Sequence, residues 1–178
     1  MSYNDCFSFE EYEGAIGCDS FVGGNKDLIL VKLGVALDTT NQSAVQAAIS
    51  AGDAFIFPNL RIGLEGASGQ TAESPIANMP DRNINYERTA TIRDLKVTPQ
   101  NVVAWNSILD STGAIFGTAV IHNDTQARQW KINGYITIGG DQLLIPEAVE
   151  EVQEINLTMS WKEKTMPVFE ALNPIFTA

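Results

Sequence analysis

RQWKINGYITI, residues 128–138, is the stretch that decides the fold class of this sequence. Its apolar positions share one face of an extended chain: Trp130, Ile132, Ile136 and Ile138. This alternation is typical of a β-strand with one face against a core, and Gly134 is a candidate β-bulge within it. The apolar stretch AIFGTAVIH (114–122) and the turn NDTQA come directly before it. The sequence therefore predicts a β-hairpin here.

Strand signals continue on both sides of this hairpin. In EINLTMSWK (154–162) the inward positions are Ile155, Leu157, Met159 and Trp161. NINYERTATI (83–92) alternates in the same way, and FIFPNLRI (55–62) is a plausible strand to pair with it. LILVKLG (28–34) is a short apolar run bounded by turn residues, as in a buried strand. Together these stretches predict a mainly β fold, an antiparallel sandwich or barrel with one or two flanking helices.

The clearer of the two predicted helices lies in TPQNVVAWNSILDSTG (98–113). Thr98 is placed as the N-cap, Pro99 as the first helical residue, and Gly113 after the stop. The expected core-facing stripe consists of Val102, Val103, Trp105, Ile108 and Leu109. Residues at this spacing fall on one side of a helix, so the helix is expected to pack on the β-core.

A second, shorter helix is predicted within DTTNQSAVQAAISAGDA (38–54). Thr40 or Asn41 can cap its start, and Gly52 sits at its stop. Its narrow apolar stripe is Ala44, Val45, Ala48 and Ile49.

We expect two parts in the chain, an N-terminal arm at 1–25 and a single β-rich domain at 26–178. The arm has mixed periodicity and four aromatic residues, Tyr3, Phe7, Phe9 and Tyr12. These rings would pack either on their own domain or on a neighbouring subunit.

A long insertion, GLEGASGQTAESPIANMP at 63–80, separates two predicted strands that a short turn could join. Loops of this length are usually functional or disordered. The residues that suit it to lie along a partner are the permissive glycines Gly63, Gly66 and Gly69 and an apolar foot, Ile76 and Met79. The sequence therefore predicts a projecting interaction loop.

The chain has 178 residues and a formal net charge of -11, with 22 Asp and Glu against 11 Lys and Arg. An acidic balance argues against sequence-specific nucleic-acid binding and against an anionic membrane surface, which both require basic clusters. The acidic N-terminus is unlike a secretory signal, and no apolar run is long enough to span a bilayer. Cys6 and Cys18 are expected to remain ordinary thiols.

No constellation of catalytic residues is visible, so we expect no enzyme, no cofactor and no metal site. His122 is the single histidine, and no Gly-x-Ser-x-Gly elbow accompanies it. The acidic residues Glu147, Glu150, Glu151 and Glu154 form one cluster. Paired acids can perform glycosidase chemistry, but a solvent-facing acidic face is the preferred interpretation.

The order of the predicted elements resembles that of the tail tube proteins of tailed bacteriophages. The resemblance rests on the loop GLEGASGQTAESPIANMP, the helix TPQNVVAWNSIL, and the strands RQWKINGYITI and EINLTMSWK. It implies a β-sandwich or barrel that joins with copies of itself and with other virion proteins in rings, the loop reaching a neighbouring ring. It further implies a virion protein assembled in the host cytoplasm, with DNA passing through the lumen.

Two departures from that family leave other functions open, namely the aromatic arm and the additional helix near residues 41–51. A head–tail connector ring or a capsid decoration protein would accommodate both. A carbohydrate- or ligand-binding β-sandwich, such as an adhesin, is the alternative class. Exposed aromatic residues along one face would favour it, and the candidates are Tyr86, Tyr135 and Trp161.

Overall fold

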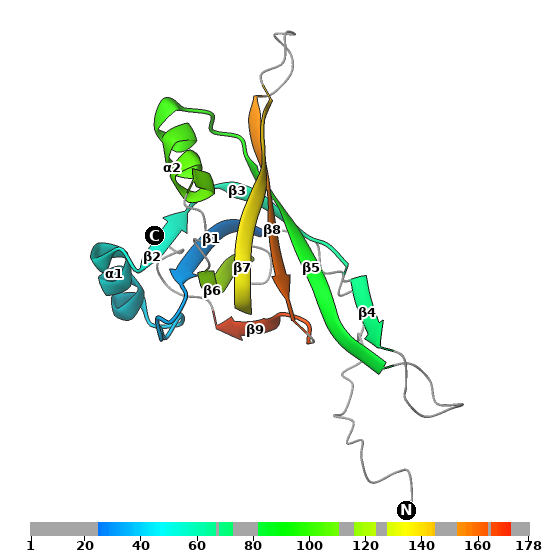
Figure 1. The fold of residues 1–178 in the computed structure, drawn as a ribbon. Coiled ribbons are helices and arrows are strands. Elements are labelled where there is room, and N and C mark those ends of the chain that lie inside the picture. The colour runs from blue at the N-terminus through cyan, green and yellow to red at the C-terminus, as the bar shows by residue number, and fades with distance from the viewer. Residues whose placement is uncertain are drawn as a thin grey trace, which may run out of the picture.

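The computed structural model describes residues 25–66, 68–72, 82–110, 116–123, 128–144, 153–163 and 165–171. In these residues the chain is mainly β with two helices, which confirms the predicted fold class (Figure 1). The strands are β1 (Asn25–Lys32), β2 (Ala54–Phe57), β3 (Leu60–Leu64), β4 (Ser68–Ala72), β5 (Arg82–Asp94), β6 (Phe116–Asn123), β7 (Arg128–Leu144), β8 (Glu154–Lys162) and β9 (Val168–Ala171). The helices are α1 (Gln42–Ala51) and α2 (Pro99–Asp110).

The strands form one continuous antiparallel sheet in the order β2-β1-β6-β7-β8-β5-β3, to which β4 adds beside β5 and β9 beside β7. The long strand β7 belongs to two layers. Its first half pairs with β6 and β9, and its second half pairs with β8. The first sheet therefore consists of β2, β1, β6, β9 and the start of β7, and the second of β8, β5, β3, β4 and the end of β7.

A β-bulge lies between the two halves of β7. Phe116 pairs with Ile136 and Thr118 pairs with Asn133, so two residues of β7 lie opposite Gly117 alone. One of them is Gly134, whose φ of 142° is in the region that favours glycine. The predicted hairpin and its bulge are both confirmed. Such a bulge bends a strand, as sharing one strand between two layers requires.

The main core lies between the two sheets. The first sheet contributes Leu28, Leu30, Phe116, Ala119, Ile121, Ile132 and Ile136, and the second contributes Leu60, Ile62, Ala90, Ile92, Ile155, Leu157, Met159 and Trp161. All four inward positions predicted for β8 are buried, since none is more than 5% exposed. The alternation read from the sequence therefore assigned the core face of β8 correctly.

Helix α1 covers the outer face of the first sheet and forms a second, smaller core there. Val45 and Ala48 pack with Ile29, Val31, Ala54 and Val120. The helix starts where predicted, because the Asn41 side chain accepts a hydrogen bond from the backbone N–H of Ala44. It ends at Gly52, which is in the left-handed conformation with φ 76°.

Helix α2 also begins as predicted, with the Thr98 hydroxyl accepting from the N–H of Asn101 at 3.2 Å. Its anchor is Trp105, which is 2% exposed and stacks on Phe57 at 4.3 Å between ring centroids. The inclusion of Val103 in the core-facing stripe was wrong, since its exposed fraction is 67%. Val103 comes one residue after Val102 and therefore lies about 100° further around the helix, which turns its side chain away from the sheet.

The predicted strand 55–62 is in fact two strands separated by Pro58 and Asn59. β2 pairs with β1, whereas β3 pairs with β5 at the opposite end of the strand order. Proline cannot donate to a sheet ladder, and Asn59 has a φ of 61°, so the chain turns here. This corner carries the chain from one sheet directly to the other.

Candidate assembly surface

The most distinctive feature outside the core is a two-stranded ribbon formed by β4 and the first half of β5. Its register pairs Ser68 with Glu87 and Ala72 with Arg82. The neighbouring ladder of β5 with β8 ends where Glu87 meets Lys162. Residues 82–86 are therefore paired with β4 alone among the described strands, and the ribbon extends away from both helices (Figure 1).

The ribbon corrects the prediction that residues 63–80 form one projecting loop, because part of that stretch lies in strands. Gly63 belongs to β3, Gly69 belongs to β4, and Gly66 lies in the short connection between them. Strand pairing through the backbone does not need alternating apolar side chains when a long neighbouring strand supplies the ladder, so the sequence pattern missed it. Ile76 and Met79, the predicted apolar foot, lie outside the described residues.

Glu65 attaches the base of the ribbon to the body. Its two carboxylate oxygens accept hydrogen bonds from the hydroxyls of Thr91, at 2.6 Å, and Thr89, at 2.9 Å. Its backbone N–H donates to the carbonyl of Thr89. The hydroxyl of Thr91, followed by that of Thr89, lowers the pKa of Glu65 because both stabilise its charged form. Nothing in the sequence pattern singled out this residue.

The predicted acidic face is contradicted at one of its four members. The Glu154 side chain is only 12% exposed and forms an ion pair with Arg93 of β5. It also accepts from the Asn156 amide at 3.0 Å. The Arg93 hydrogen bond, followed by that of Asn156, lowers the Glu154 pKa. Glu154 is the first residue of β8, where cross-strand pairing brings it beside Arg93; Glu147, Glu150 and Glu151 lie outside the described residues.

His122 has a structural setting. It is 3% exposed on β6, and its Nδ1 lies 2.8 Å from Oδ2 of Asp27 on β1. The other carboxylate oxygen of Asp27 accepts the backbone N–H of Asn59 at 2.8 Å. The pair therefore connects the first sheet to the corner between β2 and β3.

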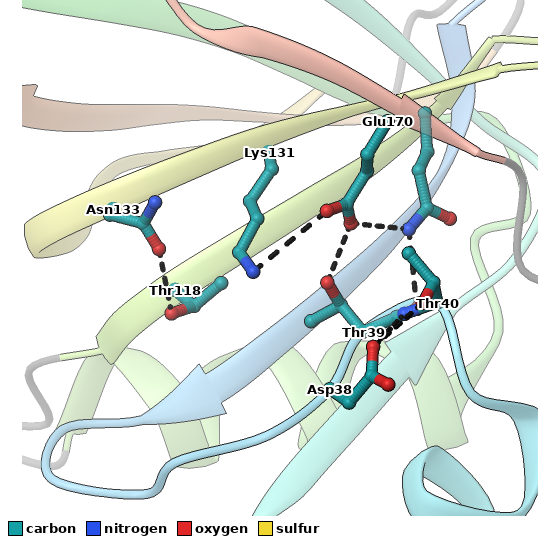
Figure 2. A network of polar contacts seen from close by, with 8 residues as sticks. Asp38, Thr39, Thr40, Thr118, Lys131, Asn133 and Glu170 are labelled. Atoms are coloured by element: carbon teal, nitrogen blue, oxygen red, sulfur yellow. Dashed lines mark hydrogen bonds and ion pairs between the residues drawn. The ribbon is translucent and has the colours of Figure 1, made fainter.

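A second polar cluster holds β9 against the first sheet (Figure 2). One carboxylate oxygen of Glu170 accepts from the Thr39 hydroxyl and from the Gln129 amide, both at 2.5 Å. The other lies 3.8 Å from the ammonium of Lys131. Gln129 and Thr39 are almost fully buried, so their polar groups are satisfied within the cluster. It joins three distant parts of the sequence, and no local pattern could have revealed it.

The aromatic residues considered for carbohydrate binding do not form an exposed row. Trp161 is 3% exposed, and its indole N–H donates to Glu163. Tyr86 is half-buried, with the Arg88 guanidinium 5.9 Å from its ring centroid. Tyr135 is exposed for 68%. A sugar-stacking face needs several exposed rings in line, and these three residues do not provide one.

The described residues contain no group of three or more His, Cys, Asp or Glu side chains placed to hold a metal ion. None of the helices in the described ranges has the length and apolar character needed to cross a bilayer.

Comparison with known proteins found no protein-family model, no curated protein and no solved structure that matches the chain.

Proposed function

We propose that this chain is a non-enzymatic structural subunit of a bacteriophage virion. It assembles with copies of itself into rings, as a tail tube-like or head–tail connector protein, and contacts other virion proteins. Assembly takes place in the host cytoplasm, and DNA passes through the ring without sequence-specific binding. The observation that carries this proposal is the projecting β4–β5 ribbon.

A two-stranded ribbon outside a sheet is a poor stability element but a good interaction element. Isolated two-stranded hairpins are marginally stable in water, and unpaired strand edges readily accept another chain. Residues 82–86 extend beyond the end of β8, so β4 is the one described strand that pairs with them, while the Glu163 N–H donates to the Tyr86 carbonyl at the inner end. Contact with a second subunit would stabilise the ribbon, and in a closed ring each copy contributes the same contact.

The position of the ribbon along the chain agrees with the resemblance to tail tube proteins. It begins at Ser68, within the stretch that the resemblance equates with a stacking loop. The β-sandwich body and the flanking helix α2 also agree with that family at the level of architecture. We also propose that acidic residues line the DNA path. Glu154 is paired with Arg93, so the residues proposed for this lining are Glu147, Glu150 and Glu151.

The direct test is the size and shape of the purified protein in solution. Light scattering after size exclusion should give a multiple of the subunit mass, and negative-stain microscopy should show rings or tubes. A monomer at all concentrations, with no particles on the grid, would contradict the proposal and would favour the ligand-binding module.

A ribbon variant makes the test specific. Ser68 pairs with Glu87, so replacing residues 69–86 by Asn-Gly removes the ribbon and leaves a two-residue turn that matches the register. We expect this variant to remain folded but to lose stacking or docking. The control is Gln46→Ala on the exposed side of α1, which should assemble normally. Particles of normal length from the ribbon variant would show that the β4–β5 ribbon is not the interaction element.

A further inference from the structure

The sequence contains one Asn-Gly pair, Asn133–Gly134, and the fold places it at the bulge of β7. We propose that Asn133 deamidates spontaneously in the folded protein, through attack of the Gly134 backbone nitrogen on the side-chain amide. This modification site is independent of the proposed assembly. Three features of the structure carry the inference: the bulge, the exposure of Asn133, and a hydroxyl beside its amide.

The bulge releases Gly134 from the regular ladder. Asn133 pairs with Thr118 and Ile136 pairs with Phe116, so Gly134 has no register partner on β6. The described pairs of β7 with β9 end at Lys131, and those with β8 begin at Thr137. Glycine has no side chain to obstruct the approach of its own nitrogen to the preceding amide. Gly134 therefore lies outside the described ladder pairs, although a side chain at this position would meet the Lys162 carbonyl at 3.4 Å.

The group that is attacked, the side-chain carbonyl of Asn133, is accessible and polarised. Asn133 is exposed on the outer face of the first sheet. Its amide oxygen accepts a hydrogen bond from the Thr118 hydroxyl at 3.3 Å (Figure 2). When the Gly134 nitrogen attacks the side-chain carbonyl carbon, negative charge develops on this oxygen. A hydroxyl already directed at it stabilises that charge.

The reaction balances without a cofactor. The Gly134 nitrogen loses its proton to solvent base and forms a bond to the side-chain carbonyl carbon of Asn133, and ammonia leaves. The resulting five-membered succinimide takes up one water molecule. Opening at one carbonyl gives Asp, and opening at the other gives isoaspartate, whose main chain runs through the former side chain.

Both products alter the chemistry of this face. Lys131 lies two residues earlier on the same side of β7 and is already near Glu170. A carboxylate at position 133 adds a second negative group to that side of the sheet. Isoaspartate also lengthens the backbone at the bulge, where the strand already accommodates an extra residue.

Peptide mapping of the intact, folded protein tests the proposal. Trypsin cleavage after Lys131 and Lys162 releases residues 132–162, which contain Asn133 and Asn156. After incubation at mildly alkaline pH, fragment masses should show the mass increase from amide to acid at position 133 and not at position 156. The conversion should slow as pH is lowered, because the attacking nitrogen must lose its proton.

Two comparisons make the result decisive. Protein unfolded in urea gives the reference rate for the free Asn-Gly pair. Conversion in the urea sample with none in the folded sample would overturn the proposal, because the fold would then protect the site. Thr118→Val should slow the folded-state reaction about 2- to 10-fold, the factor that one hydrogen bond supplies. An unchanged rate in that variant would remove the role of the hydroxyl, and Asn133→Gln should abolish the modification.

Discussion

Between Arg88 and Asp94, strand β5 lies beside β8 and for most of that length also beside β3, with Ala90 and Ile92 completely buried. Between Arg82 and Tyr86 the same strand pairs with β4 alone within the described part of the chain. The sequence alternates in the same way through both halves. Alternation therefore identifies a strand and its two faces, whereas the number of neighbouring strands and the presence of an opposing sheet decide how much each face contributes to stability.

The comparison suggests that the two halves of β5 have different roles. The inner half stabilises the subunit through burial between the sheets, whereas the outer half is the part that the proposed function assigns to contact with another subunit. Each of the following changes should therefore have an effect that depends on which half it touches.

The largest effect is expected from Ile92→Ala in the inner half. Ile92 is completely buried and pairs with Ile62 on one side and Leu157 on the other. Removal of this side chain leaves a cavity that the surrounding sheets cannot fill, at a cost of about 2–5 kcal/mol in the free energy of unfolding. Urea denaturation measures this loss, and a change below experimental error would refute the two-layer core.

A smaller loss is expected from Trp105→Phe, which affects the end of the inner half. The indole N–H of Trp105 donates to the carboxylate of Asp94, which is 4% exposed, at 2.9 Å. Phenylalanine keeps the stacking on Phe57 but leaves this carboxylate with fewer donors, a cost of about 1–3 kcal/mol. The control on the same helix is Val103→Ala, which should change stability by no more than about 0.5 kcal/mol because the side chain is exposed.

Ile84→Ala carries the same substitution into the outer half. Ile84 lies eight positions before Ile92 on β5, in the ribbon that extends beyond β8. We expect a smaller loss than for Ile92→Ala in the isolated subunit, because β4 is the one described strand that pairs with this part of β5. Urea denaturation should be repeated after assembly, where a larger loss would show that a neighbouring subunit covers this residue. Equal losses for Ile84→Ala and Ile92→Ala in the isolated subunit would abolish the distinction between the halves.

The smallest effect concerns the boundary between the halves, where Glu65 accepts from Thr89 and Thr91. The folded-state pKa of Glu65 is lowered from its ordinary value of 4.5. A lowered pKa means that the contact stabilises the fold above that value and that this contribution is lost as pH falls through the folded-state pKa. A titration followed by NMR should show the Glu65 carboxyl titrating below 4.5, and Thr91→Val should raise its pKa towards 4.5. An unchanged titration in that variant would contradict the assigned hydrogen bond.

Local signals in the sequence were sufficient for much of the body. Asn41 and Gly52 mark the two ends of α1, and Thr98 marks the start of α2. These ends are readable because the backbone groups at a helix end are hydrogen-bonded by residues within one turn of it. The hairpin of β6 and β7 was likewise readable, since its two strands are adjacent in the sequence and one glycine marks the bulge.

The features that could not be read depend on residues far apart in the chain. The sequence pattern groups Glu154 with an acidic cluster, because its partner Arg93 lies 61 positions earlier. Glu170 binds Thr39, which is 131 positions away, and this contact has no local signature. The corner at Asn59 was missed because the apolar residues on its two sides read as one strand, although they enter different sheets. Long-range pairing decides such cases, and a single sequence carries no direct record of it.

The strand order has a consequence for how the chain acquires its structure. β1 pairs with β6, with Ile29 opposite Val120. The inner half of β5 can pair with β3 early, but it acquires its second neighbour only when β8 is present, with Ile92 opposite Leu157. Pairing over such separations requires the closure of large loops before contacts repay the lost entropy, which makes folding slow. During synthesis β1 can pair with β2, but Leu28 and Leu30 remain without most of their core partners until the later strands have been made. We therefore expect nascent chains to expose apolar strands for much of translation, the situation in which chaperones are needed.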